Sequence, residues 1–441
     1  MAEPAPGNLD RFAQRVYGSL FGDREEDEDA RVCTDISDEA CRVVPGNFLR
    51  NTLANALTKL GDALINPKTT LPWLLTALQA PGWVASLLVP VRESGSMLPQ
   101  LGIAAWLRRL PVRKWSYVGG ALGQALAVFG LAVVAATLSG AAAGWAVLAL
   151  VVAFSLARGF SSVASKDVLG KTVPKTRRGR VNGFASSAAG IGTLVFAALL
   201  WRTTEEQRPY ALLFGFCAAF WVAAAIVYAG IREHAGATEG GRNGLREAFA
   251  RLSLLREDVD FRRFLTVRAL LVGSGLAAPF LVVLAGQRSD TSLAYFLLAQ
   301  GLASMISGPV WGALADRSSR RVLILGGLGA GLLGCAVFLV DRWWPALAAT
   351  AWFLPAAFLV LAVLHDGVRL GRKTYVIDLG GGNKRTDYVA VGNTLIGAFL
   401  LVAGGITAAV QALSTGAAIL ALSVAALAAA ALAARLPEVQ R

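Results

Sequence analysis

Long apolar runs without a charged residue constrain this chain more than any other feature. Residues 118–140, VGGALGQALAVFGLAVVAATLSG, contain no Asp, Glu, Lys or Arg, and similar runs recur along the 441 residues. An α-helix of about 20 such residues crosses the hydrocarbon core of a bilayer. Charged residues make up 16% of the chain, whereas soluble proteins contain about 25%. We therefore predict an all-α polytopic membrane protein.

Apolar runs separated by polar or helix-breaking segments predict twelve transmembrane helices. The first run is long for a single crossing and contains Pro67 and Pro72, so we expect it to be kinked. The predicted spans are 47–78, 82–106, 115–137, 142–165, 181–201, 209–231, 263–287, 292–315, 321–340, 344–368, 388–410 and 413–435.

The loops between these spans alternate sharply in charge. Loops on one side hold 25 Lys and Arg residues, and loops on the other side hold four. The positive-inside rule then places the basic loops and both termini in the cytoplasm, in a bacterial-type inner membrane. The net charge of +13 is thus a topology signal, and we expect no nucleic-acid partner. Residues 1–45 contain no apolar leader segment.

Self-similarity at an offset of about 210 residues indicates a duplicated half. The segment Pro99-Gln-Leu-Gly102 ends the second span, Pro309-Val-Trp-Gly312 ends the eighth, and residues 165–190 match 372–397 in character. We predict two pseudo-symmetric six-helix bundles. The expected divisions are a cytoplasmic tail at 1–45, the halves at 46–231 and 263–436, a linker with an amphipathic helix at 232–262, and a C-terminus at 437–441.

Two motifs resemble those of the major facilitator superfamily. The stretch GALADRSSRR at 312–321 is similar to the signature between the second and third helices of a half. The stretch ARGFSSVASKDVLGKTVPKTRRGRVNG at 157–183 is similar to the fourth helix and the loop after it, with Arg158 as the family's arginine. The N-terminal copy of the signature is degraded, with Trp106 where the Asp would fall. The resemblance covers residues 46–436 and implies a transporter whose halves rock about a central cavity.

A polar stripe follows one face of the first predicted helix. A stripe of this kind cannot face acyl chains, so it must face other helices or water. The resemblance implies that it lines the central cavity, and a packed polar seam between helices is the alternative. Its members, three or four residues apart, are Asn51, Asn55, Lys59, Asp62, Asn66 and Thr69.

Charged residues in the first two spans are the candidates for handling substrate and protons. Lys59 and Asp62 are three residues apart and can pair, whereas Arg92 and Glu93 are consecutive and point about 100° apart. We predict one cluster of these four groups with zero net charge, in which a carboxylate freed from its cation takes up a proton. Static pairs between helices are the alternative. The equivalent stretch GLAS at 301–304 is uncharged, so we expect this chemistry in the N-terminal half.

Charged residues near the ends of other spans have two interpretations each. By resemblance, Arg158 takes part in proton coupling, and simple anchoring at the membrane surface is the alternative. His365, Asp366 and Arg369 lie near the end of the tenth span, where His365 either titrates or packs as a polar residue.

The signature motif is expected to form a cytoplasmic gate. By resemblance, it holds the cytoplasmic side closed in the outward-facing state. Mere positive-inside charge is the alternative for its arginines. The gate residues are Gly312, Asp316, Arg317, Arg320 and Arg321.

Missing motifs exclude other classes of function. No G-x-x-x-x-G-K-[ST] loop is present, and with only His234 and His365 as histidines we expect no metal, no cofactor and no enzyme. We predict a monomeric secondary active transporter for a small organic solute, coupled to protons. A drug or amphiphile efflux antiporter remains open, although the fifth span lacks the Gly-Pro motif of drug antiporters. A non-transporting receptor or channel on the same scaffold is the third alternative.

Overall fold

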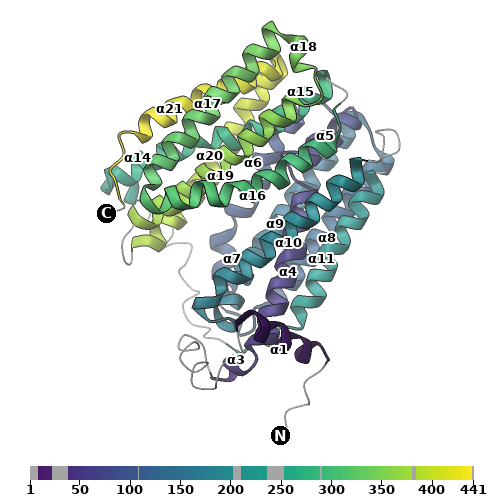
Figure 1. Cartoon of the computed structure of the whole chain (residues 1–441), viewed down its shortest axis with the longest axis vertical. Helices are drawn as coiled ribbons and strands as arrows, with labels where there is room; N and C mark the ends of the chain where they lie inside the picture. The colour runs from purple at the N-terminus through teal and green to yellow at the C-terminus, as the bar shows by residue number, and fades with distance from the viewer. Residues whose placement is uncertain are drawn as a thin grey trace.

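All regular secondary structure is helical in the part of the chain that the computed structural model describes, residues 8–21, 38–107, 109–201, 210–235, 253–288, 291–379 and 384–439. The helices shown in Figure 1 are α1 (Asn8–Phe21), α3 (Asp38–Arg42), α4 (Val44–Leu64), α5 (Thr70–Ala77), α6 (Trp83–Met97), α7 (Gln100–Leu107), α8 (Lys114–Thr137), α9 (Gly140–Thr172), α10 (Lys175–Trp201), α11 (Tyr210–Ala229), α13 (Leu254–Glu257), α14 (Val259–Leu276), α15 (Ala278–Arg288), α16 (Leu293–Arg317), α17 (Ser319–Trp343), α18 (Pro345–Ala348), α19 (Phe353–Leu379), α20 (Lys384–Leu413) and α21 (Thr415–Ala433).

Each of the twelve predicted spans overlaps one helix or a broken pair of helices. The tenth, predicted at 344–368, is wrong in its bounds, because its long helix α19 runs over Phe353–Leu379 and places His365, Asp366 and Arg369 in its middle rather than near its end. The pairs α4–α5, α6–α7 and α14–α15 correspond to the first, second and seventh spans. By length and composition, nine helical segments of the described chain can cross a membrane by themselves. The predicted all-α, twelve-helix membrane class is confirmed. The exact domain boundaries stay a prediction, and most of the predicted linker at 232–262 lies outside the described residues.

The first span is interrupted where its prolines predict a bend. Helix α4 ends at Leu64, and the N–H groups of Thr69 and Leu71 both donate to the carbonyl of Asn66. The Asn66 side-chain oxygen accepts from the N–H of Lys68 at 2.8 Å, as Asn commonly does in turns. Pro67 has no N–H to continue a helix. The chain therefore makes a turn at residues 65–69, and this turn carries Lys68.

Two bundles are joined by two pairs of helices. Helices α4–α11 pack together, α14–α21 pack together, and α6–α20 and α10–α16 make the main contacts between them (Figure 1). The Ser94 hydroxyl on α6 donates to the carbonyl of Gly397 on α20 at 2.7 Å. A Cβ on Gly404 would lie 2.5 Å from Pro90. Small residues at these positions let helices approach closely where lipid provides no hydrophobic driving force.

The two bundles meet tightly at one end of the molecule. There α5 packs on α15, and a Cβ built on Gly286 would lie 3.0 Å from the Thr76 methyl group. The rings of Trp73 and Phe296 lie nearby with centroids 6.0 Å apart. These contacts are apolar and close, so this end is sealed.

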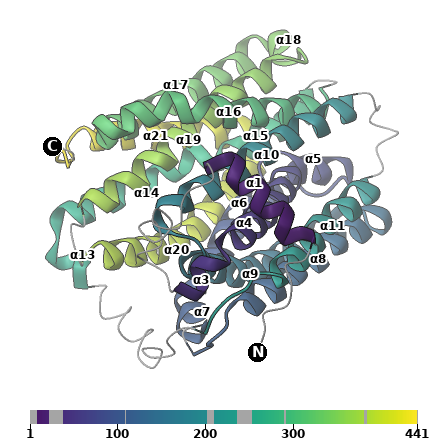
Figure 2. The same ribbon diagram turned by 60° about the horizontal axis from the view of Figure 1, so that its bottom comes forward.

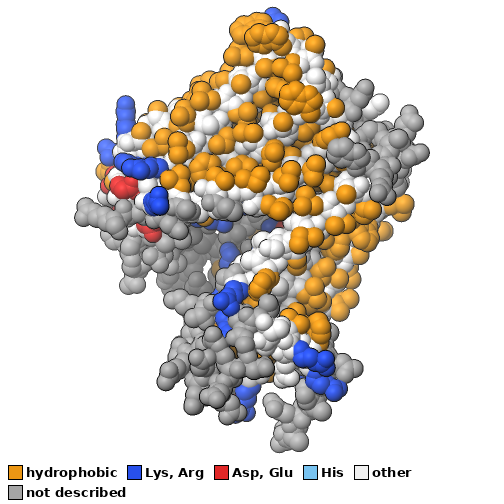
Figure 3. All heavy atoms as spheres, in the orientation of Figure 1, with side chains coloured by type: hydrophobic (Ala, Val, Ile, Leu, Met, Phe, Trp, Pro, Cys, Tyr) orange, Lys and Arg blue, Asp and Glu red, His pale blue; other side chains and the backbone are white. Residues whose placement is uncertain are grey.

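The opposite end is hollowed between the bundles. In Figure 3 apolar side chains cover the outer face, while Lys and Arg side chains lie in the hollow and near the ends of the molecule. Figure 2 shows α1 lying across this end, over α4, where Tyr17 packs edge-on against Phe48 with centroids 5.6 Å apart. Arg177 at the start of α10 stacks over the Tyr17 ring at 4.8 Å. The N-terminal helix is therefore docked on the bundle.

A charge clamp holds the N-terminal bundle together at the same end. Arg113 pairs with Asp167 on α9, and the N–H of Arg113 donates to the Glu233 carboxylate at 2.9 Å. Lys171 lies 3.0 Å from Asp167 and 3.2 Å from Glu233. This clamp ties the end of α9 and the chain after α11 to the start of α8.

Candidate functional site

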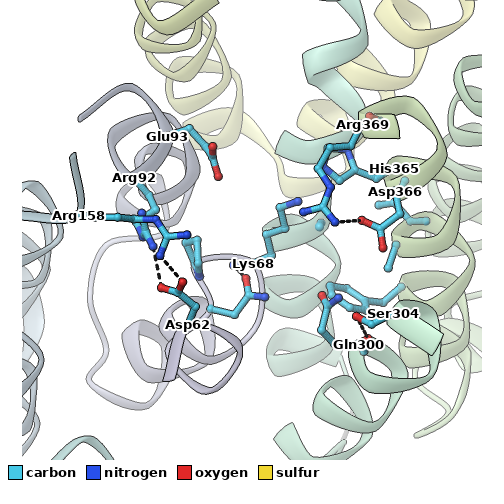
Figure 4. Close-up of a pocket in the computed structure, with 17 residues that line it drawn as sticks. Asp62, Lys68, Arg92, Glu93, Arg158, Gln300, Ser304, His365, Asp366 and Arg369 are labelled. Carbon is cyan, nitrogen blue, oxygen red and sulfur yellow. Dashed lines mark hydrogen bonds and ion pairs between the residues drawn. The ribbon is translucent and has the colours of Figure 1, made fainter. Parts of the chain in front are cut away.

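A cavity of about 240 Å³ lies between the two bundles. Figure 4 shows its polar side chains converging from opposite walls. The N-terminal half contributes Asp62, Asn66, Pro67, Lys68, Arg92, Glu93 and Arg158, and the C-terminal half contributes Ser274, Ala278, Gln300, Ser304, Phe358, Leu361, Ala362, His365, Asp366 and Arg369.

Asp62 on α4 is bridged by two arginines from two other helices. Arg92 on α6 donates to Oδ1 of Asp62 at 3.0 Å, and Arg158 on α9 pairs with Oδ2 (Figure 4). The side chains of Asp62 and Arg92 are 20% and 10% exposed. Both oxygens of the carboxylate therefore face a guanidinium, in charge-assisted contacts.

Arg92 is further held by an aromatic ring. Its guanidinium lies 4.5 Å from the centroid of the Phe154 ring, and Phe154 packs edge-on against Trp221. A guanidinium on a ring face is stabilised by the negative charge of that face. This contact fixes Arg92 within the bundle, whereas Arg158, whose side chain is 35% exposed, is the more accessible of the two.

The predicted four-residue cluster is wrong in two of its members. Lys59 does not pair with Asp62: its ammonium donates to the Asn182 carbonyl at 3.1 Å and to the Ser186 hydroxyl at 2.7 Å, both on α10. Because α10 packs along α4, these oxygens lie within reach of the long side chain. Glu93 lies near Arg92 and Arg158 but makes no ion pair with any described residue, and Arg158 takes the place that was predicted for Lys59.

Some residues of the polar stripe on the first helix line the cavity, and others pack between helices, so each interpretation holds for part of the stripe. Asp62 and Asn66 line the cavity. Asn51 is buried and donates to the Asn47 carbonyl at 2.9 Å and to Thr172 on α9 at 3.4 Å, so it belongs to a packed seam. Asn55 is half-buried and lies outside the cavity lining.

Glu93 and Lys68 face the cavity without a partner. Neither side chain makes a hydrogen bond or ion pair to any residue that the structure describes, and both are half-buried. In Figure 4 both point toward the centre of the cavity. Sequence reasoning missed Lys68 because it treated residues 47–78 as one helix, on which Lys68 lies off the polar stripe. The signal was the Asn66-Pro67 pair, which breaks the helix there.

The C-terminal half places more polar and charged side chains in the cavity than predicted. Asp366 and Arg369 on α19 pair at 3.0 Å, and His365 Nδ1 lies 3.0 Å from the Ser274 hydroxyl. Gln300 and Ser304 on α16 line the same wall. The prediction that charged chemistry is confined to the N-terminal half is therefore wrong.

The predicted gate residues lie at the hollowed end, away from the cavity. Arg320 donates to the Leu436 carbonyl at 2.9 Å and lies 3.5 Å from Glu438. A Cβ on Gly312 would meet no described atom within 4 Å. The side chain of Asp316 lies outside the described part. The gate stays a prediction, as do the roles of Arg317 and Arg321.

No group of three or more His, Cys, Asp or Glu residues that could hold a metal ion occurs among the described residues. No known family model matches the chain. Uncharacterized proteins of Mycobacterium bovis and Mycobacterium tuberculosis are 27% identical over 340 residues. These matches cover 73% of this chain and 64% of the relatives' length.

Solved transporter structures share the fold. A POT family transporter in complex with 5-aminolevulinic acid has a TM-score of 0.68 at 11% identity, covering 88% of this chain and 95% of its own. The peptide transporter POT in complex with sulfate has a TM-score of 0.67 at 12% identity, covering 92% and 97%. The D-xylose-proton symporter has a TM-score of 0.61 at 12% identity, covering 90% and 98%. The chain therefore has the fold of major facilitator superfamily transporters, and it is a multi-pass membrane protein.

Proposed function

We propose that this protein is a secondary active transporter that moves a small organic solute by alternating access, coupled to protons. One observation carries the proposal: charged side chains from both bundles line a single cavity between a sealed end and a hollowed end. Charge at membrane depth is costly and is usually retained for function. The similarity to peptide transporters and a D-xylose-proton symporter supports the same class.

We propose that the protein lies in a bacterial inner membrane with its hollowed end toward the cytoplasm, and the charge distribution supports this. The basic segments before α8 and after α9 lie at the hollowed end, as does the N-terminal helix. The positive-inside rule assigns this end to the cytoplasm. The conformation is then inward-facing, with α5 and α15 closing the outer side.

Glu93 is the better of the two predicted proton sites. The Asp62 carboxylate lies between two guanidiniums, so removing its charge would leave both without a counter-ion. Glu93 reaches the cavity and makes no hydrogen bond or ion pair with a described residue, so its protonation breaks no such contact. We assign Asp62 to positioning Arg92 and Arg158, and Glu93 to binding the proton.

Counterflow separates a carrier from a channel or a receptor. Purified protein is first screened by thermal shift against a library of small solutes, and the stabilising solutes are then tested as labelled compounds in preloaded proteoliposomes. Transient accumulation above equilibrium is expected, because a carrier exchanges solute through one cavity that opens to each side in turn. A stabilising solute that gives no counterflow, or that equilibrates without overshoot, would contradict the proposal.

Proton coupling is tested with a pH-sensitive dye inside the same proteoliposomes. Solute-driven proton movement is expected for the unmodified protein and is expected to be lost in Glu93→Gln, which cannot change its charge. Glu93→Gln should still perform counterflow, since exchange needs no net proton movement. Proton movement that persists in Glu93→Gln would remove Glu93 from the coupling mechanism.

A further inference from the structure

We propose that the transported solute is a small organic oxyanion bound between Lys68 and Arg158, and that protonation of Glu93 is what makes the cavity accept it. This inference rests on the transport function proposed above and adds the chemical class of the substrate. Three observations carry it: the charge balance of the cavity, the donors that remain unused, and the position of Glu93 among the cations.

The cavity holds more positive than negative charge, and most of its negative charge is already engaged. Its charged lining consists of four cations, Lys68, Arg92, Arg158 and Arg369, and three carboxylates, Asp62, Glu93 and Asp366. Asp62 is bridged by two arginines, and Asp366 is paired with Arg369. Lys68 is then the cation, and Glu93 the carboxylate, that have no ion-pair partner among the described residues.

Unused hydrogen-bond donors point into the cavity from Lys68 and Arg158. Lys68 is held at the turn between α4 and α5 by the Asn66 side chain, and its ammonium extends toward the cavity centre (Figure 4). Arg158 uses one terminal nitrogen for Asp62, and its other donors bond to no described residue. An ammonium and a guanidinium together match a carboxylate or phosphate group, which accepts several charge-assisted hydrogen bonds.

Cations face Glu93 from several sides. Arg92 adjoins it on α6, Arg158 faces it from α9, Lys68 from the α4–α5 turn and Arg372 from α19. Helices α5 and α20 also pack on α6. Neither Thr70–Ala77 of α5 nor Val391–Leu413 of α20 contains a charged residue.

The helices α14 and α15 add little charge near Glu93. Arg268 on α14 donates to Asn393 at 2.8 Å, and Arg288 on α15 pairs with Asp341 at the sealed end. Ionised Glu93 is thus the negative charge in this set that a bound anion would replace.

Protonation of Glu93 and binding of an anion must therefore favour each other. An ionised Glu93 repels an incoming oxyanion and competes with it for Lys68 and Arg158, whereas a neutral Glu93 does neither. By thermodynamic linkage the anion then raises the proton affinity of Glu93 by the same factor, and such couplings are typically about 5- to 150-fold. This gives a physical basis for moving anion and proton in the same direction.

The alternative occupant is a zwitterion whose ammonium pairs with Glu93. A zwitterion needs the ionised carboxylate, so its affinity would fall on protonation of Glu93. The net positive lining favours the anion, because a zwitterion leaves the excess positive charge uncompensated. The cavity volume of about 240 Å³ limits either class to small molecules.

Equilibrium binding on the detergent-purified full chain tests this inference without transport. The probes are lactate, succinate and inorganic phosphate, with alanine as the zwitterion, each titrated up to about 10 mM by calorimetry at pH 8 and pH 6. At least one anion is expected to bind about tenfold more tightly at pH 6. Phosphate and succinate change their own charge between these pH values, so for them the effect of Glu93 is the part of the pH dependence that is lost in Glu93→Gln. Lactate stays ionised at both pH values, so Glu93→Gln should bind it with the same affinity at both. Whichever anion binds, Glu93→Gln should bind it more tightly than the unmodified protein does at pH 8.

Charge-matched variants localise the site. Lys68→Gln is expected to weaken anion binding at least about tenfold, as expected for losing a charge-assisted hydrogen bond. Arg263→Gln removes one positive charge from the exposed start of α14, where Arg263 lies 3.4 Å from Asp260, and should leave binding unchanged. Equal effects of the two variants would show that the anion senses only net charge, and would overturn the site.

Other outcomes reject the inference, specify the anion, or separate the anion site from the transport function. Tighter binding of alanine than of every anion, weakened in Glu93→Gln, would assign a zwitterion, and binding of none of the probes would reject the oxyanion site. Phosphate bound in preference to both carboxylates would identify a phosphorylated rather than a carboxylate substrate. Anion binding with these properties but without counterflow would refute the transport function and leave the anion site standing.

Discussion

At the scale of single residues, the three carboxylates that line the cavity differ in the number of arginines with which each one pairs. Asp62 has two arginines, Asp366 has one, and Glu93 has no ion-pair partner in the described chain. Removing one member of a buried ion pair is strongly destabilising because the remaining charge is left without compensation. The three carboxylates should therefore differ in how much they stabilise the fold and how much they serve binding.

Asp62→Asn is expected to lower the thermal stability of the purified protein more than Asp366→Asn does. The first change leaves Arg92 and Arg158 facing each other, at a cost of about 3 kcal/mol. The second change frees Arg369, whose side chain is 55% exposed and stays hydrated. The apparent melting temperature of both variants, measured side by side with Glu93→Gln, checks this order. A Glu93→Gln variant less stable than Asp62→Asn would contradict it.

At the scale of helices, close packing depends on where glycine faces a neighbour. The contact of α6 with α20 holds the bundles together, and consecutive glycines on α20 have different surroundings. A Cβ on Gly404 would lie 2.5 Å from Pro90, whereas one on Gly405 would meet no described atom within 4 Å. The two positions therefore form a matched pair for testing the contact.

Gly404→Ala is expected to destabilise the protein by about 1–3 kcal/mol, since the new methyl group overpacks α6 against α20. Gly405→Ala should be neutral or slightly stabilising, because alanine is the better helix former. Thermal unfolding in detergent compares the two. Equal melting temperatures would show that α6 moves away from α20 without cost, and that this contact does not hold the bundles at a fixed distance.

At the scale of the whole molecule, the bundles are sealed at one end and apart at the other. In the proposed alternating-access cycle, the seal at α5 and α15 must open when the cavity faces the opposite side. A Cβ on Gly286 would lie 3.7 Å from the Cβ of Thr76. Disulfides have Cβ atoms about 3.8 Å apart, so a cysteine pair at these positions fits a disulfide.

Thr76→Cys combined with Gly286→Cys is expected to stop counterflow under oxidising conditions, because the disulfide prevents the sealed end from opening. Reduction should restore counterflow. Each single cysteine variant and the unmodified protein, treated with the same oxidant and reductant, control for the native cysteines. Counterflow that continues through the crosslinked protein would show that α5 and α15 do not separate during transport.

The sequence by itself determined the membrane class and the number of spans. Apolar runs of bilayer length can only be helices in lipid, and the turn at Asn66 and Pro67 follows from local backbone chemistry. The polar stripe was also visible, because a helix repeats its faces every three or four residues. These features depend on neighbours in the chain, and so they were predictable.

Only the tertiary structure decided which charges meet. Lys59 and Asp62 share a helix face, yet Lys59 bonds to α10 and Asp62 bonds to α6 and α9. The N-terminal half places Glu93 and Arg158 in one wall of the cavity. The C-terminal half places Ser304 and Asp366 in the other wall, about 210 residues further along the chain from Glu93 and Arg158 respectively. Side chains this distant in sequence are brought together by packing of whole bundles, which no local spacing encodes. The unpaired state of Glu93 and Lys68 among the described residues, on which the proposed binding depends, is a property of that packing.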